Sequence, residues 1–219
     1  MDMIKSNRPS RGYFQVGAIA AANLRHHFIP QLLLSIVFLI MTPLLFGTTN
    51  LDTVASAIPL ERFVILIGIL LLTPVFAPEQ DPQIGDLVTC RAVSPTVVII
   101  IRLVIALLTL FVLIAGFCVY MKFCGCFITA TLFFGTLASA VFLGSLGTLT
   151  AALTNSSVVA YMVPVVYYAV NFSGGKYLGS FYLFSMSAGN GGGKTGLFIL
   201  GMLLLVLAVL VHKIKQRSA

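Results

Sequence analysis

Charged side chains are scarce in this sequence. Asp, Glu, Lys and Arg together make up 9% of the 219 residues, whereas apolar residues make up 59%. An ordinary soluble domain has roughly 25% charged and 45 to 50% apolar residues. So few ionisable groups cannot cover the surface of a water-soluble globule of this length. The composition therefore indicates an integral membrane protein, for which the bilayer is the solvent.

Metal-ligand spacing is also missing. The pair Cys124 and Cys126 has no second Cys or His pair to complete four-coordination, and Cys90 and Cys118 stand apart from it. We expect a structural role for all four cysteines. The count leaves the oxidation state of Cys124 and Cys126 open.

Acidic residues are outnumbered by basic ones. Six Asp and Glu stand against thirteen Lys and Arg, which gives a net charge of +7. A clustered basic face would indicate a nucleic-acid binder. Here the basic residues are scattered, and most lie at the ends of apolar runs, a pattern that orients a membrane protein. We therefore expect membrane lipid, and no nucleic acid, around this chain.

Long apolar runs are the main feature that is present. A helix needs about 20 largely apolar residues to cross the membrane, because each residue advances ~1.5 Å through a core ~30 Å thick. The uncharged stretch between Lys122 and Lys176 would be roughly 80 Å long as one helix, so it must cross twice, with a turn at 154–157. The sequence thus predicts one all-α membrane domain over 1–219, with six transmembrane helices at about 28–46, 63–78, 97–121, 127–153, 158–172 and 196–211.

Basic residues near the span ends predict the orientation, since cytoplasmic loops hold the excess of Lys and Arg. With both termini in the cytoplasm, nine basic residues are cytoplasmic and four are external: Arg62, Lys122, Lys176 and Lys194. Residues 1–27 then form a cytoplasmic N-terminus. Within it, Tyr13–His27 is expected to lie along the inner interface as an amphipathic helix, or else to be a disordered lead-in.

Small residues recur at four-residue intervals in the predicted fourth span. Gly135 is followed by Ser139, and Ala140 by Gly144 and Thr148. This spacing lets helices approach closely. We expect it to serve packing within the chain rather than a dimer contact.

The segment Ala188–Thr195, AGNGGGKT, loosely fits a phosphate-binding loop. Such a loop requires a β-strand before it and a helix after it on a cytosolic α/β sheet. Here an aromatic-rich stretch precedes it, a membrane span follows, and the predicted topology places it outside. A flexible turn in the external loop 173–195 is the better interpretation.

The cytoplasmic loop 79–95, between the second and third spans, is the most informative segment. It holds three of the six acidic residues. Its apolar residues Ile84, Leu87 and Val88 recur at helical spacing, which predicts a short amphipathic helix over about 82–93 that closes at Ser94-Pro95.

This loop resembles the coupling-helix loop of type-2 ABC exporter permeases, in which an acidic start, a short helix and a small-residue–proline turn follow the second span. The resemblance extends to the six-span plan, the interfacial helix before the first span and the glycine- and aromatic-rich external region before the last. It implies docking onto an ATPase subunit through Glu79, Gln80, Asp81, Ile84, Asp86, Leu87 and Arg91. A hydrated loop whose charges keep it in water is the alternative.

The same resemblance implies a permease subunit in the bacterial plasma (inner) membrane, with a second permease chain, identical or related, and cytosolic ABC ATPase subunits as partners. ATP and Mg would bind the ATPase, and no cofactor would bind this chain. Aromatic residues on uncharged spans suit an amphipathic or hydrophobic substrate, such as an antibiotic peptide, a drug or a lipid-like molecule, although they could equally pack against neighbours or lipid. These candidates for the substrate path are Phe133, Phe134, Phe142, Tyr161, Tyr167 and Tyr168.

No predicted span contains a carboxylate near its middle. An intramembrane enzyme needs a nucleophile, base or metal ligand within the membrane, and proton relays use buried Asp, Glu or His. We therefore expect no catalytic residue and no metal site. Two other functions stay open, namely a stand-alone secondary transporter or channel, and a membrane-embedded enzyme or scaffold.

Overall fold

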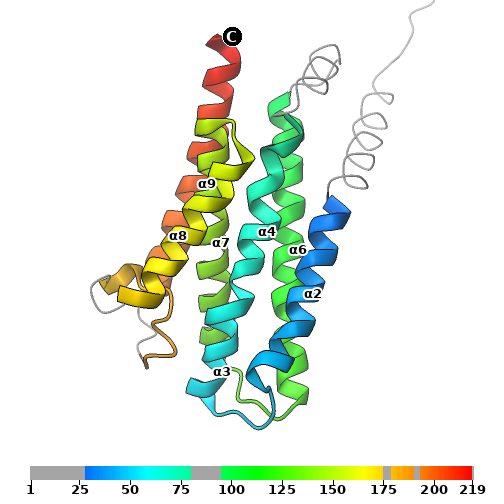
Figure 1. Ribbon diagram of the computed structural model, residues 1–219, viewed down its shortest axis with the longest axis vertical. Coiled ribbons are helices and arrows are strands. Elements are labelled where there is room, and N and C mark those ends of the chain that lie inside the picture. The colour runs from blue at the N-terminus through cyan, green and yellow to red at the C-terminus, as the bar shows by residue number, and fades with distance from the viewer. Residues whose placement is uncertain (1–27, 80–94, 175–178, 190–192, 219) are drawn as a thin grey trace, which may run out of the picture.

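The computed structural model describes residues 28–79, 95–174, 179–189 and 193–218. These residues form an elongated bundle of helices and contain no β-strand (Figure 1). The predicted interfacial helix at 13–27 and the predicted coupling helix at 82–93 lie outside the described residues. The helices are α2 (Ile29–Phe46), α3 (Thr53–Pro59), the π-helix η2 (Leu60–Val64), α4 (Leu66–Leu72), the 3₁₀ helix η3 (Thr73–Glu79), α6 (Pro95–Phe123), α7 (Ala130–Thr154), α8 (Ser157–Gly174), the 3₁₀ turn η5 (Gly179–Phe181) and α9 (Lys194–Ser218).

Five helical segments of the described chain are long and apolar enough to cross a membrane, and α8 is a shorter apolar helix. The prediction of an all-helical, multi-pass membrane protein is confirmed at this level. The five segments are Ile29–Phe46, Thr53–Phe76, Thr96–Phe123, Ala130–Thr154 and Lys194–Lys215.

The second span begins earlier than the sequence analysis predicts. It starts at Thr53, where the carboxylate of Asp52 accepts a hydrogen bond from the backbone N–H of Ala55 (2.9 Å) and caps the helix. Pro59 lies inside it, and there the helix widens into the π-helix η2. The helix therefore continues through Glu61 instead of starting after it, and this carboxylate lies within the span.

The helix α7 forms the centre of the bundle and packs against α4, α8 and α9. In its apolar 18-residue stretch 72% of the residues are buried, whereas 11% of the residues of α2 are. Its small residues allow this, because a Cβ on Gly144 would lie only 2.5 Å from the carbonyl oxygen of Gly68 on α4. The predicted small-residue positions are all buried inside the chain, so the prediction of internal packing is confirmed: Gly135, Ser139, Ala140, Gly144 and Thr148.

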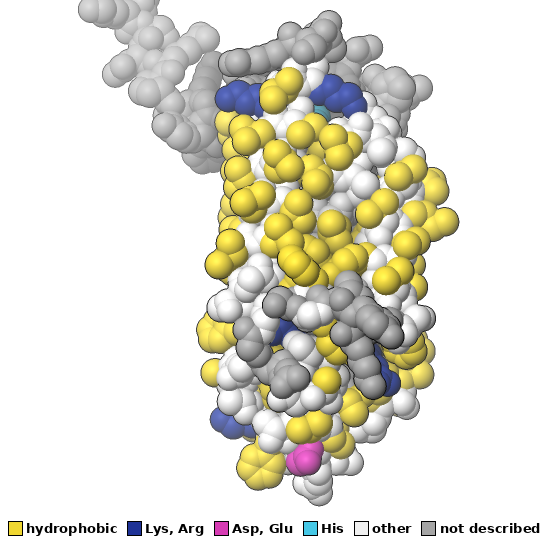
Figure 2. Space-filling model, turned by 90° about the vertical axis from the view of Figure 1, so that its left-hand side faces the viewer, with side chains coloured by type: hydrophobic (Ala, Val, Ile, Leu, Met, Phe, Trp, Pro, Cys, Tyr) yellow, Lys and Arg dark blue, Asp and Glu magenta, His cyan; other side chains and the backbone are white. Residues whose placement is uncertain are grey.

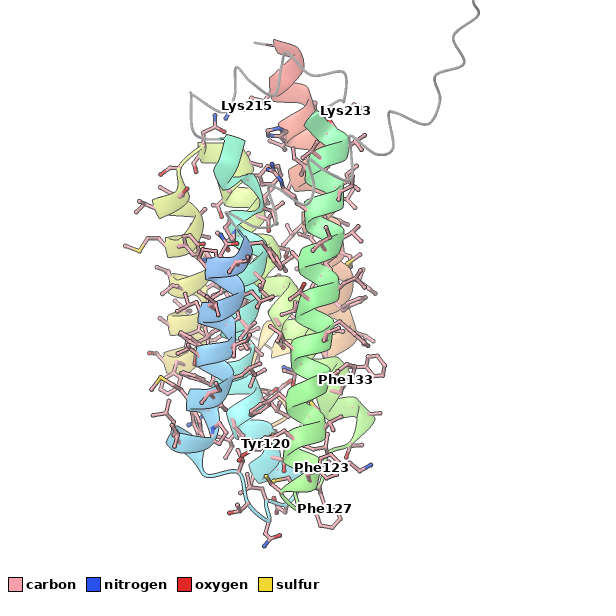
Figure 3. All side chains as sticks on the ribbon, turned by 90° about the vertical axis from the view of Figure 1, so that its right-hand side faces the viewer. Tyr120, Phe123, Phe127, Phe133, Lys213 and Lys215 are labelled. Carbon is pink, nitrogen blue, oxygen red and sulfur yellow. The ribbon has the colours of Figure 1, made fainter. Side chains whose placement is uncertain are left out.

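The two ends of the bundle differ in chemistry. One, here called the aromatic end, carries Tyr120, Phe123 and Phe127, and the other, the basic end, carries Lys213 and Lys215 (Figure 3). At the aromatic end the α2–α3 and α6–α7 connections are joined by backbone hydrogen bonds, from Asn50 N–H to the Cys124 carbonyl (3.1 Å) and from Phe127 N–H to the Leu51 carbonyl (3.0 Å). Cys118, Cys124 and Cys126 are free thiols.

The helix α8 stops short of the aromatic end, and the segment that follows it lies beside the bundle (Figure 1). We call residues 179–189 the linker. On the face formed by α8 and α9, apolar side chains cover the part nearer the basic end, and the part around the linker is more mixed (Figure 2). On this side, α8 therefore covers only part of the length of the bundle.

Candidate functional site

A buried ion pair joins the linker side of the bundle to its second span. The carboxylate Oε1 of Glu61, on η2, lies 2.7 Å from the ammonium Nζ of Lys194, the first residue of α9. The Glu61 side chain is 0% exposed and that of Lys194 is 7% exposed. Burying charges is costly unless they are paired and hydrogen-bonded, and ionisable groups inside a membrane protein mark functional sites by default.

Both charged groups of this pair make further hydrogen bonds. The Lys194 ammonium also donates to the Ser139 hydroxyl oxygen (2.9 Å) on α7 and to the Leu183 carbonyl oxygen of the linker. The Glu61 carboxylate accepts backbone N–H bonds from Met186 (3.1 Å) and Ser187 (2.8 Å). Since an ammonium has three N–H donors, no donor of Lys194 is left over. The cluster therefore fixes the position of the linker.

Asn171 ties the same linker to α8. Its side-chain carbonyl oxygen accepts the backbone N–H of Leu183 (3.0 Å), and its amide nitrogen donates to the Tyr167 carbonyl (2.9 Å). The Tyr167 hydroxyl donates to the Phe181 carbonyl (2.8 Å). Asn171 is fully buried, so these partners satisfy a polar group that would otherwise be costly. The linker is thus held by η2, α7, α8 and α9 together.

The local sequence of α7 makes room for this cluster. A Cβ on Gly135 would lie 3.2 Å from Cγ of Lys194 and would press on the side chain of Met186. Glycine here lets the aliphatic stem of Lys194 run against the helix. Ser139, about one turn further along α7, then meets the ammonium.

The ion pair lies well inside the apolar thickness of the bundle. At ~1.5 Å per residue, Glu61 is about 12 Å from the start of its span at Thr53, and Ser139 is about 13 Å from the start of α7 at Ala130. A hydrocarbon core is ~30 Å thick. The charges therefore sit in the half of the span nearer the aromatic end rather than at a loop surface.

This pair is not apparent from the sequence. Hydropathy predicts Glu61 before the second span, Lys194 in an external loop, and spans without a central carboxylate. Glu61, which lies within the second span, corrects these expectations. Two features of the sequence could have indicated the pair. Glu61 is the one acidic residue between Asp52 and Glu79, and Lys194 lies directly before an apolar run. What hydropathy did not reveal is that the two charges meet.

The side chains of the predicted docking residues lie outside the part of the chain that the structure describes. Glu79 ends η3, and the others lie outside the described residues. They are Gln80, Asp81, Ile84, Asp86, Leu87 and Arg91.

The predicted substrate-path aromatics are divided between two packing regions. Phe133 stacks edge-on against Phe111 of α6, with ring centroids 5.4 Å apart, and also contacts Phe134 (5.2 Å). The other rings pack elsewhere: Phe142 contacts Tyr167 (5.3 Å), Tyr168 contacts Phe184 of the linker (5.5 Å), and Tyr161 is partly buried against the core. These contacts give the aromatics packing roles.

Comparison of the chain with protein-family models, with curated proteins and with solved structures finds no match. Among the described residues, no group of three or more His, Cys, Asp or Glu side chains is placed to hold a metal ion. The geometry and the sequence patterns therefore carry the information about function.

Proposed function

We propose that this chain is the membrane-spanning subunit of an ATP-driven exporter of the type-2 ABC permease kind. In this proposal a second permease chain and separate cytosolic ATPases, which bind ATP and Mg, complete the transporter. Both termini and the loop 79–95 face the cytoplasm of a bacterial cell. The substrate is an amphipathic or hydrophobic molecule.

The observation that carries the proposal is where the two helices joined by the loop 79–95 lie in the bundle. The end of η3 and the start of α6, which this loop joins, lie at the same end of the bundle as the C-terminal part of α9 (Figure 1). That is the basic end, with Lys213 and Lys215 (Figure 3). Because cytoplasmic ends hold the excess of Lys and Arg, the acidic loop would face a soluble ATPase.

The closed interior gives further support. Most of α7 beyond its first turns is enclosed by its neighbours, and the charged groups beside it, Glu61 and Lys194, are satisfied by partners within the chain. A polar path through this interior would require breaking those contacts. A route along an outer face, shared with a second permease chain, avoids that cost and favours a paired transporter over a single-chain channel.

The docking hypothesis is tested by copurification and ATP hydrolysis. The chain is purified from native membranes, the soluble protein that accompanies it is identified, and the complex is reconstituted in vesicles. We expect the variant Glu79→Ala/Asp86→Ala/Arg91→Ala to lose both the bound ATPase and its stimulated hydrolysis. The control is Asp52→Asn, which changes an acid at the opposite end and keeps a helix-capping side chain. Unchanged ATPase binding in the triple variant contradicts the proposal.

A second candidate, an ion-coupled secondary transporter, is favoured by one observation. Buried ionisable groups in membrane spans often belong to ion or proton pathways, and Glu61 with Lys194 is such a pair. This candidate predicts flux into vesicles that contain only this chain when an ion gradient is imposed. It also predicts loss of that flux in Glu61→Gln. An absence of gradient-driven flux, together with ATP-dependent flux once the ATPase is added, rejects it.

A further inference from the structure

A hollow of about 350 Å³ lies next to the ion pair, between α7 and the start of α9. It exists because α9 begins deeper in the bundle than α7 does. Lys194, the first residue of α9, bonds Ser139, so the first turns of α7 extend past the beginning of α9. The side chains that matter for its chemistry are Thr131, Phe134 and Leu137 from α7 and Lys194, Thr195 and Phe198 from α9.

The hollow is apolar and electrically neutral. Lys194 presents its aliphatic stem there, because its ammonium is bonded to Glu61, Ser139 and the Leu183 carbonyl. A water molecule needs two to four polar partners, and these walls are mostly hydrocarbon. Apart from the Lys194 ammonium, which is bonded to the partners just named, the polar groups among these side chains are the hydroxyls of Thr131 and Thr195. A charged ligand would lack a counter-charge in this hollow.

The hollow opens toward the surface that faces the membrane. Phe134 is 62% exposed and Phe198 is 39% exposed, and exposed apolar side chains continue along α9 at Ile199 and Met202. In a membrane, these side chains contact lipid chains. The volume lies within the ~300 to 1,000 Å³ typical of small-molecule sites. The occupant with the matching chemistry, and with direct access, is therefore a lipid hydrocarbon chain.

We propose that the hollow between α7 and α9 is a binding site for one acyl chain of a membrane lipid from the leaflet at the aromatic end. The acyl chain lies between the rings of Phe134 and Phe198. It covers the apolar wall of α7 that the late start of α9 leaves open. The lipid thereby supports the turn that carries Lys194. This site is independent of ATP-driven export and would serve any of the functions considered above.

Photolabelling of the purified full-length chain tests the site. The probe is phosphatidylethanolamine with a diazirine in one acyl chain, added in small amount to detergent micelles, and the labelled peptides are mapped by mass spectrometry. We expect labelling to concentrate on 131–138 and 194–198 and to be displaced by excess unmodified phosphatidylethanolamine. Labelling that is spread evenly over exposed apolar positions such as Leu33 and Leu44 of α2, or that excess lipid does not displace, overturns the proposal.

A variant that fills the hollow provides the second measurement. Thr131 is exposed at its edge, so Thr131→Phe adds a ring there without changing a buried position. We expect saturable labelling to fall by roughly tenfold, while Leu203→Phe, an exposed position further along α9, keeps the wild-type level. Equal labelling of both variants contradicts the assignment. If Thr131→Phe does not fold, displacement in the wild-type chain still decides the question. Since no ATPase is present, the result is separate from the test of export.

Discussion

At the scale of single residues, the chemistry of this bundle is concentrated at two charges. Glu61 and Lys194 come from distant parts of the sequence and neutralise each other inside the apolar core. Replacing both members of such a pair by apolar groups is often tolerated, whereas removing one leaves an uncompensated buried charge. The pair therefore makes a clear energetic prediction.

Removing one partner should destabilise the protein far more than removing both. We expect Glu61→Gln or Lys194→Met to lower the free energy of unfolding by about 3 to 5 kcal/mol, and Glu61→Leu/Lys194→Met to recover much of that loss. Thermal unfolding of the detergent-purified chain measures the effect. The matched control is Arg62→Gln, which removes an exposed charge next to Glu61 in the sequence. The Arg62 guanidinium lies 5.5 Å from the centroid of the Phe172 ring. Equal effects for single and double variants would show that the pair is not coupled.

The Asn171 contact predicts a local change in the linker. Asn171→Ala removes the acceptor for the Leu183 N–H, and an unsatisfied buried donor costs about 1 to 3 kcal/mol. We expect faster amide hydrogen exchange at Leu183 and its neighbours, while the rest of the bundle keeps its protection. Val170→Ala, at an exposed position on the same helix, serves as the control. Unchanged exchange in Asn171→Ala would mean that the Asn171 contact does not hold the linker in place.

At the scale of elements, glycines set the distance between α4 and α7. A Cβ at Gly68 would overlap the backbone carbonyl of Ala140, and backbone cannot move aside as a flexible side chain can. By contrast, a Cβ at Gly116 of α6 meets nothing within 4 Å. Substituting each glycine by alanine therefore distinguishes the effect of close packing, at Gly68, from the effect of helix propensity, at Gly116.

The glycine pair gives a matched prediction. Gly68→Ala should push α4 from α7 and destabilise the bundle by about 1 to 3 kcal/mol, as overpacking does. Gly116→Ala should be neutral, or stabilising by about 0.5 to 1 kcal/mol, because alanine favours a helix over glycine. Thermal unfolding in detergent compares them. A loss of stability at Gly116 that equals the loss at Gly68 would refute the close-packing argument.

At the scale of the whole molecule, the difference between the basic and aromatic ends predicts which end meets the cytoplasm. The aromatic end carries Cys124, which is partly exposed, while Cys118 and Cys126 are buried. Cys90 belongs to the predicted cytoplasmic loop. The chain thus offers natural thiols for both sides of the membrane.

Thiol labelling of intact cells tests the orientation. In single-cysteine variants, a membrane-impermeant maleimide should label Cys124 at once and Cys90 only after permeabilisation, because the excess of Lys and Arg predicts that the basic end faces inward. Peptide mass spectrometry reads the labelled site. The reverse pattern would place the acidic loop outside, where no cytosolic ATPase could bind it.

Much of the architecture was accessible from the sequence. The lengths of the apolar runs predicted most of the spans, since the thickness of the hydrocarbon core limits how long a crossing must be. The four-residue spacing of small residues, such as Gly144 and Thr148, predicted that this helix packs within the chain, because helical periodicity places such residues on one face. The start of the second span was missed, because hydropathy treated Glu61 as a boundary.

The amino-acid sequence by itself determined that this chain is helical and suited to a membrane, because composition and periodicity are local properties that act on every residue. Only the tertiary structure decided that Glu61 and Lys194 meet, that the linker is fastened between four helices, and that a hollow remains beside α9. These features depend on which distant segments become neighbours. A charge near an apolar run can be either a span boundary or half of a buried pair, and the partner that distinguishes the two is supplied by the fold.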